Sequence, residues 1–166
     1  SNVTERVIIH HEKSSSDLNT LIKDAYTALQ QKDLDRASRL YDEALNISPG
    51  QRDALLGAAA AATASGRFND AASFYQKQLA ADPKDNFARA GLLALMNDGK
   101  SRAAVQQEVS DMLKINPRSA HLHFLKGVGF AAGNRWSLAQ SAFYEAYNLD
   151  NKNPDYAFNL AVALDH

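Results

Sequence analysis

The 166-residue sequence contains no cysteine, which excludes disulfide bonds and thiolate metal sites. This absence does not fix the compartment, because a cysteine-free chain is stable in both the cytoplasm and the periplasm. No apolar run approaches the roughly 20 residues of a membrane-spanning helix, so we expect a soluble domain with no membrane insertion of this segment. The formal net charge is -1 and the basic residues are scattered, which leaves no basic stripe for nucleic acid.

The sequence also lacks the common catalytic motifs. It has no glycine-rich phosphate loop, no zinc-protease helix motif and no nucleophile elbow. His121 and His123 are the most suggestive metal-binding pair, but two residues apart on a helix they point about 200° apart. We therefore predict no catalytic residue, no cofactor and no metal, and a chain that is not an enzyme.

Proline is scarce, and its placement is periodic. Pro49, Pro83 and Pro117 lie 34 residues apart, and each closes a stretch with the same pattern. This period is typical of arrays of helical hairpins, because proline ends one helix and resets the chain for the next. The predicted repeats are residues 18–51, 52–85, 86–119 and 120–153, followed by a partial repeat over 154–166.

Residues 1–16 do not follow this period. We predict a flexible N-terminal tail there, with Asp17 as the N-cap of the first repeat helix. The third repeat departs most from the shared pattern, since Leu93, Val105 and Met112 occupy places where small residues are usual. A local irregularity is expected in that repeat.

The pattern resembles the tetratricopeptide repeat family over about 150 of the 166 residues. The family prefers small residues, large or aromatic residues and a proline at fixed places, which the first repeat supplies as Leu21, Ala25, Leu34, Ala37, Tyr41, Ala44 and Pro49. The fourth repeat supplies Gly127, Phe130, Trp136, Ala139, Phe143 and Ala146, but has Asn151 where proline is expected. The resemblance implies an all-α fold, a right-handed superhelical array of antiparallel helix pairs.

In this family the first helices of successive repeats line a concave groove. Transferring the groove positions selects mostly apolar residues, namely Ile22, Lys23, Tyr26, Leu56, Gly57, Phe87, Gly91, His121, Phe124, Leu125, Val128, Phe158 and Asn159, with Asp53 and Ala60 beside them. The resemblance thus implies a scaffold that binds an apolar helix or extended peptide, anchored by Tyr26, Phe87 and Phe124. Gly57 and Gly91 indicate either tight helix packing or close approach of a partner to the backbone.

The carboxylate clamp of chaperone-binding relatives is missing. Where that clamp has lysine, arginine and asparagine, this sequence has Ile22, Tyr26, Gly57, Phe87 and Gly91. None of these side chains supplies the charged hydrogen bonds that hold a terminal carboxylate. Binding of chaperone tails by these repeats is therefore rejected.

The expected partner is another protein or a peptide segment, within an assembly such as a bacterial envelope, pilus or secretion complex. The alternative is a self-associating module, a homo-oligomer joined through the N-terminal tail or the C-terminal partial repeat. In one form of it, Val3, Val7, Ile8 and Ile9 occupy a groove. At the other end, Leu160 and Leu164 are expected to be covered by a continued array or by another chain.

Overall fold

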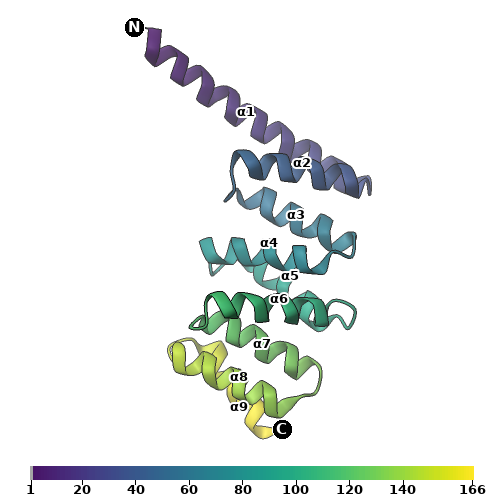
Figure 1. Ribbon diagram of the computed structural model, residues 1–166, viewed down its shortest axis with the longest axis vertical. Helices are drawn as coiled ribbons and strands as arrows, with labels where there is room; N and C mark the ends of the chain where they lie inside the picture. Colours follow the sequence, from purple (N-terminus) through teal and green to yellow (C-terminus); the bar gives the residue numbers. More distant parts are fainter. Residues whose placement is uncertain (1) are drawn as a thin grey trace. The chain divides into compact units, whose positions relative to one another are not determined.

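The computed structural model describes the backbone of residues 2–166, and the side chains of Ser15 and of residues 17–166. Over this range the chain forms nine helices and no strand. Within each compact unit of the chain, consecutive helices run in opposite directions (Figure 1). The helices are α1 (Asn2–Gln30), α2 (Leu34–Ile47), α3 (Arg52–Ala64), α4 (Phe68–Ala81), α5 (Asn86–Asn97), α6 (Arg102–Ile115), α7 (Ala120–Ala132), α8 (Trp136–Leu149) and α9 (Pro154–Asp165). The all-α helical repeat fold predicted from the sequence is confirmed.

The helices divide between two compact units. The first unit extends to Arg89 and holds the pairs α1–α2 and α3–α4 with the start of α5. The second unit begins at Ala90 and holds the rest of α5 together with α6, α7, α8 and α9. Within the described part of the chain, no helix combines the length and apolar character needed to cross a bilayer.

The helix starts follow the sequence period except at the N-terminus. Four helices begin at the first residues of the predicted repeats: α3 at Arg52, α5 at Asn86, α7 at Ala120 and α9 at Pro154. Asp17 is not an N-cap, because α1 begins at Asn2 and runs through it. The flexibility of residues 1–16 stays a prediction, and the side chains of Val3, Val7, Ile8 and Ile9 lie outside the described residues.

A polar residue two places after each repeat's proline position begins the next hairpin. Its side chain accepts a hydrogen bond from a backbone N–H in the first turn of the following helix, which satisfies a donor that the helix itself leaves unpaired. These residues are Gln51, Asp85, Ser119 and Asn153. The capping residue that recurs with the repeat period therefore marks where the first helix of each following hairpin begins.

The turn inside each hairpin shows where the third repeat differs. Lys32, Gly66 and Asn134, one in each of the other three complete repeats, have left-handed backbones with φ of 61°, 72° and 56°. Lys100 has no such φ, and α5 has 12 residues where α3 and α7 have 13. Instead, the guanidinium of Arg102 donates to the carbonyl of Met96 (3.0 Å) at the end of α5. The expected irregularity lies at this turn.

Small residues let the helices of a hairpin approach closely. In the first unit, Ala25, Ala37 and Ala44 have no exposed surface, and Tyr41 fills the remaining space at 2% exposure. In the second unit Phe143 is the large core residue, packed on Phe124 and Trp136. The alternation of alanine and large side chains lets the helices pack closely.

Candidate functional site

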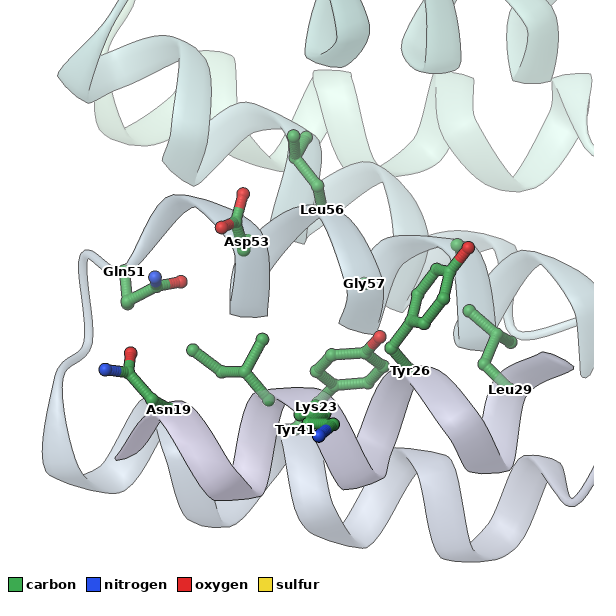
Figure 2. Close-up of a pocket in the computed structure, with 11 residues that line it drawn as sticks. Asn19, Lys23, Tyr26, Leu29, Tyr41, Gln51, Asp53, Leu56 and Gly57 are labelled. Atoms are coloured by element: carbon green, nitrogen blue, oxygen red, sulfur yellow. The ribbon is translucent and has the colours of Figure 1, made fainter. Parts of the chain in front are cut away.

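A hollow of about 580 Å³ lies between α1 and α3 in the first unit (Figure 2). In Figure 2 the side chains of Asn19 and Tyr26 rise from α1, those of Asp53 and Leu56 come from α3, and the ring of Tyr41 lies between the two helices. The lining residues are Asn19, Ile22, Lys23, Tyr26, Leu29, Tyr41, Gln51, Asp53, Leu56, Gly57 and Ala60.

Helical spacing explains why these residues meet. Ile22, Tyr26 and Leu29 are four and three residues apart, so they share one face of α1. On α3, Asp53, Leu56 and Ala60 have the same spacing and form the facing wall. Tyr26 keeps 58% of its surface exposed, so its ring is free to contact a partner.

The floor of the hollow is a tyrosine packed on a glycine. A Cβ placed on Gly57 would overlap the ring of Tyr41, which comes from α2. The glycine is therefore needed for Tyr41 to insert, so tight helix packing accounts for this position. Burial raises the pKa of Tyr41, and the nearby Tyr26 and Asp53 raise it further. The hydroxyl stays protonated at neutral pH and can donate a hydrogen bond.

The rim of the hollow is polar. It carries Asn19, Lys23, Gln51 and Asp53, of which only Lys23 is cationic. Asp53 lies 3.4 Å from the guanidinium of Arg52, and both groups are about half exposed, so this ion pair is weak. An apolar hollow with a few polar groups at its edge is typical of a site for an organic ligand or a peptide side chain.

The tetratricopeptide repeat family model matches residues 28–96, which include the α3 wall and the Tyr41 floor of the hollow but only Leu29 of its α1 wall. The match covers less than half of the 166 residues. The resemblance inferred from the sequence pattern is thereby confirmed. The matched residues include α2, α3 and the start of the third repeat. No curated protein matches the sequence.

Several solved structures share the fold, among them tetratricopeptide repeat proteins. MamA is 17% identical, with a TM-score of 0.51 over 91% of this chain and 82% of that one. YrrB, described as a tetratricopeptide protein with an unusual peptide-binding site, is 19% identical, with a TM-score of 0.50 over 99% and 83%. PilF from Pseudomonas aeruginosa is 18% identical, with a TM-score of 0.50 over 92% and 70%. At these identities the likeness concerns the fold alone, and tetratricopeptide repeat proteins are generally interaction scaffolds without catalysis.

Phe87, the predicted anchor in the third repeat, is open to solvent. It is 72% exposed, and the guanidinium carbon of Arg52 lies 5.4 Å from the centre of its ring. Asp85 holds Arg52 in this position, with 2.6 Å between Arg52 Nε and Asp85 Oδ2. The first unit thus presents Phe87 with its ring face covered by a cation.

Three of the predicted groove residues of the second unit belong to its core. Leu125 is 1% exposed and cannot present a side chain to a partner, which corrects its assignment to the groove wall. Phe124 is half-buried, with its ring centre 5.8 Å from that of Phe143 and 5.2 Å from that of Tyr156. Val128 packs against the same cluster. The main role of Phe124 is therefore in the core packing of the second unit, and only part of its ring is exposed to a partner.

The remaining predicted site residues differ in their exposure and in their hydrogen bonds. Gly91 and His121 are half-buried, and Phe158 is 69% exposed. The amide of Asn159 donates to the carbonyl of Asp155 (2.8 Å), so that donor is already used within α9. Among the described residues, no three histidine or acidic side chains lie together as metal ligands.

Four lining residues were absent from the groove positions named from the family pattern. Asn19 lies one helical turn before Ile22, and Leu29 lies one turn after Tyr26, so helical spacing could have found both. Gln51 directly precedes the first residue of α3 and could have been found from that position. Tyr41 could not be found in this way, because the pattern assigns the groove to first helices and Tyr41 belongs to a second helix. Its contact with Gly57 requires coordinates.

Proposed function

We propose that this protein is a binding scaffold whose hollow between α1 and α3 takes an apolar helix or an extended peptide. The observation that carries the proposal is that seven residues selected by the family pattern line this one hollow: Ile22, Lys23, Tyr26, Asp53, Leu56, Gly57 and Ala60. They come from two helices of different repeats, separated by α2 in the sequence. A partner seated there contacts both repeats at once.

The binding energy would come from a few apolar side chains. Tyr26 is 58% exposed, and Ile22 and Leu56 are half-buried, so a partner can remove further apolar surface from water at all three. Fully burying such a side chain is worth roughly 1.5–3 kcal/mol. Rings at the centre of an interface commonly supply most of its affinity, which gives Tyr26 the leading role.

The charges favour an internal segment of a partner over its C-terminus. Lys23 is the single cation of the lining, and Asp53 stands on the opposite wall. A terminal carboxylate needs several charged or amide donors to compensate for its lost water. The protonated hydroxyl of Tyr41 suits a backbone carbonyl of the partner instead.

The biological setting follows only from the family resemblance. We infer a place in a larger protein assembly, with envelope, pilus or secretion complexes as the expected kind. Self-association through the N-terminal tail or the C-terminal partial repeat is the competing hypothesis, and the solution mass of the protein over a range of concentrations distinguishes the two.

The experiment selects random 12-residue peptides displayed on phage against the wild-type protein and measures the selected peptides by calorimetry. The account expects peptides rich in aromatic and aliphatic residues that bind a monomeric protein. Tyr26→Ala and Leu56→Lys should each weaken binding at least tenfold. Ile115→Lys is the matched control, because Ile115 is 87% exposed and lies outside the hollow.

Equal binding by Tyr26→Ala, Leu56→Lys and the wild type would overturn the assignment of the hollow. Circular dichroism of each variant shows that the helices are retained. A concentration-dependent dimer that loses mass on Tyr26→Ala would instead support self-association through this surface.

A further inference from the structure

Two cations meet over one aromatic ring where α7 leads into α8. The ammonium nitrogen of Lys126 lies 6.0 Å from the centre of the Phe130 ring, and the guanidinium carbon of Arg135 lies 5.1 Å from it. Lys126 and Phe130 are half-buried and share one face of α7, while Arg135 is exposed directly before α8. We call these three residues the Phe130 cluster. The ring attracts both charges and so holds them in one place.

The charges of this cluster are not neutralised by a carboxylate of the described residues. Neither Lys126 nor Arg135 takes part in an ion pair within that part of the chain. Residues 112–144, which include α7 and the start of α8, contain four lysines and arginines and no aspartate or glutamate. The positive charge of α7 is therefore not compensated by its neighbours along the sequence.

The turn between α5 and α6 adds positive charge to the same place. A guanidinium nitrogen of Arg102 lies 3.9 Å from the position that a Cβ on Gly133 would take, so the start of α6 lies beside the α7–α8 turn. Within this neighbouring turn Lys100 and Arg102 face one carboxylate, Asp98, which accepts a hydrogen bond from the backbone N–H of Lys100 (3.2 Å). Cations that are scattered in the sequence thus converge in the second unit.

The equivalent arginine of the first unit has its partners within the chain. Arg67, two periods before Arg135, lies 3.5 Å from the carboxylate of Asp70 and donates a 2.6 Å hydrogen bond to the hydroxyl of Ser38. At the place of Asp70 the second unit has Leu138, which is 41% exposed. Arg135 therefore lacks the carboxylate that an arginine at this place has in the first unit, and it lies one helical turn from an open apolar side chain instead.

A following repeat leaves this surface open. In the first repeat Asp33 and Arg36 occupy the places of Arg135 and Leu138, and both are exposed although α3 and α4 follow them in the same unit. A further hairpin that packed on α8 as α3 and α4 pack on α2 would leave Arg135 and Leu138 exposed in the same way. The surface is therefore available to another molecule rather than to the next helix of the array.

Its chemistry fits an acidic peptide better than a nucleic acid. Carboxylates one helical turn apart in a partner can reach both cations, because both lie within 6.0 Å of the same ring centre. Nucleic acid is held by a long row of cations along its backbone or by open rings on which bases stack. Phe130 is half-buried and its ring already carries two cations, so it offers no such platform.

We propose that the Phe130 cluster and Leu138 together bind an acidic amphipathic segment of a partner protein. Carboxylates of the segment pair with Lys126 and Arg135, and an apolar side chain between them covers Leu138. The surface belongs to the second unit and uses none of the residues that line the hollow between α1 and α3, so this inference does not rest on the function proposed for that hollow.

The test uses a helical peptide with glutamates one turn apart around a leucine, and a matched peptide with glutamine in place of each glutamate. Trp136 is the only tryptophan, directly follows Arg135 and packs in the same core cluster as Phe130, so its fluorescence reports on this surface. The glutamate peptide should bind saturably, and its affinity should fall as sodium chloride is raised from about 50 to about 500 mM. The glutamine peptide should bind at least fivefold more weakly.

The double variant Lys126→Gln, Arg135→Gln should weaken binding of the glutamate peptide at least fivefold, because it removes both cations that face the carboxylates. Arg67→Gln is the matched control, since it removes the equivalent and already paired cation of the first unit, and it should leave binding unchanged. Arg135→Glu replaces a single exposed side chain, so the helical circular dichroism should be retained. It should make a lysine version of the peptide bind more tightly than the glutamate peptide.

Four results would each overturn the proposal. They are equal binding of the glutamate and glutamine peptides, equal binding by the double variant and the wild type, no binding of the glutamate peptide up to about 1 mM, and tighter binding of a single-stranded oligonucleotide than of the glutamate peptide. The last result would assign the surface to nucleic acid.

Discussion

The guanidinium of Arg52 donates to the carboxylate of Asp85, with 2.6 Å between Nε and Oδ2, and so joins the start of α3 to the start of α5. Asp85 also accepts a hydrogen bond from the side chain of Gln78 on α4 (2.9 Å) and from the backbone N–H of Ala88 (3.1 Å). Its side chain is 1% exposed. One carboxylate therefore connects three helices of the first unit and holds Arg52 over the exposed ring of Phe87.

This carboxylate predicts an acid-sensitive first unit. The hydrogen bond from Arg52 lowers the pKa of Asp85 from 3.8 to about 2, with further lowering by Ala88 and Gln78 against the effect of burial. Because the unfolded chain binds the proton more readily, the stability contributed by Asp85 is present above pH 3.8 and is lost as the pH falls towards 2. Urea unfolding at pH 6 and pH 2.5 should show that Asp85→Asn loses less stability on acidification than the wild type.

At pH 6 the variant Asp85→Ala should lower the free energy of unfolding by about 1–2 kcal/mol, since it removes the N-cap of α5. Asp42→Ala, an exposed carboxylate on α2, is the control and should change it by less than about 0.5 kcal/mol. Identical pH dependence of the wild type and Asp85→Asn would contradict the role assigned to this carboxylate.

A second prediction concerns the packing of Tyr41 on Gly57. Alanine has a helix propensity about 1 kcal/mol better than glycine, so Gly57→Ala would stabilise an open helix. Here the added Cβ overlaps the Tyr41 ring, and overpacking typically costs about 1–3 kcal/mol. We expect thermal or urea unfolding to show a net loss of about 1 kcal/mol.

The Tyr41→Leu background supplies the control for this pair. With the ring removed, Gly57→Ala should become neutral or stabilising, and the difference between backgrounds measures the contact itself. A gain of about 1 kcal/mol from Gly57→Ala in the wild type would show that the ring moves freely and that Gly57 is not needed for packing.

Much of the fold follows from the sequence, because the period acts on residues that have local physical effects. Proline ends the second helix of a repeat, and the polar residue two places later caps the next helix, so the helix starts at Arg52 and Ala120 could be read directly. The start of α1 could not be read, since Ser14, Ser15 and Ser16 look like a boundary but lie within a continuous helix.

The candidate site was less predictable. The walls of the α1–α3 hollow follow from helical spacing and the family pattern, but its floor depends on Tyr41 crossing from α2 to Gly57. In the second unit the same pattern selected Leu125, which tertiary packing buries at 1% exposure. Spacing along one helix identifies a face, whereas the rotation of that face towards solvent depends on the neighbouring helices.

A third prediction uses the left-handed turn residues. Lys32 has φ of 61°, a backbone conformation that costs a non-glycine residue roughly 1–2 kcal/mol, so Lys32→Gly should raise the free energy of unfolding by about 0.5–1 kcal/mol. Lys100 is the equivalent residue of the third repeat but is not left-handed. Lys100→Gly should therefore give no gain, and equal gains at both positions would contradict the assigned difference between these turns.

The most direct test of the binding account is a titration of isotope-labelled protein with a selected peptide, followed by amide chemical shifts in nuclear magnetic resonance. The account predicts that the largest shifts occur at Ile22, Lys23, Tyr26, Leu56 and Gly57, which line the hollow between α1 and α3. Largest shifts at Asp42 and Glu43, on the exposed side of α2, with no change at Tyr26 and Leu56, would contradict it.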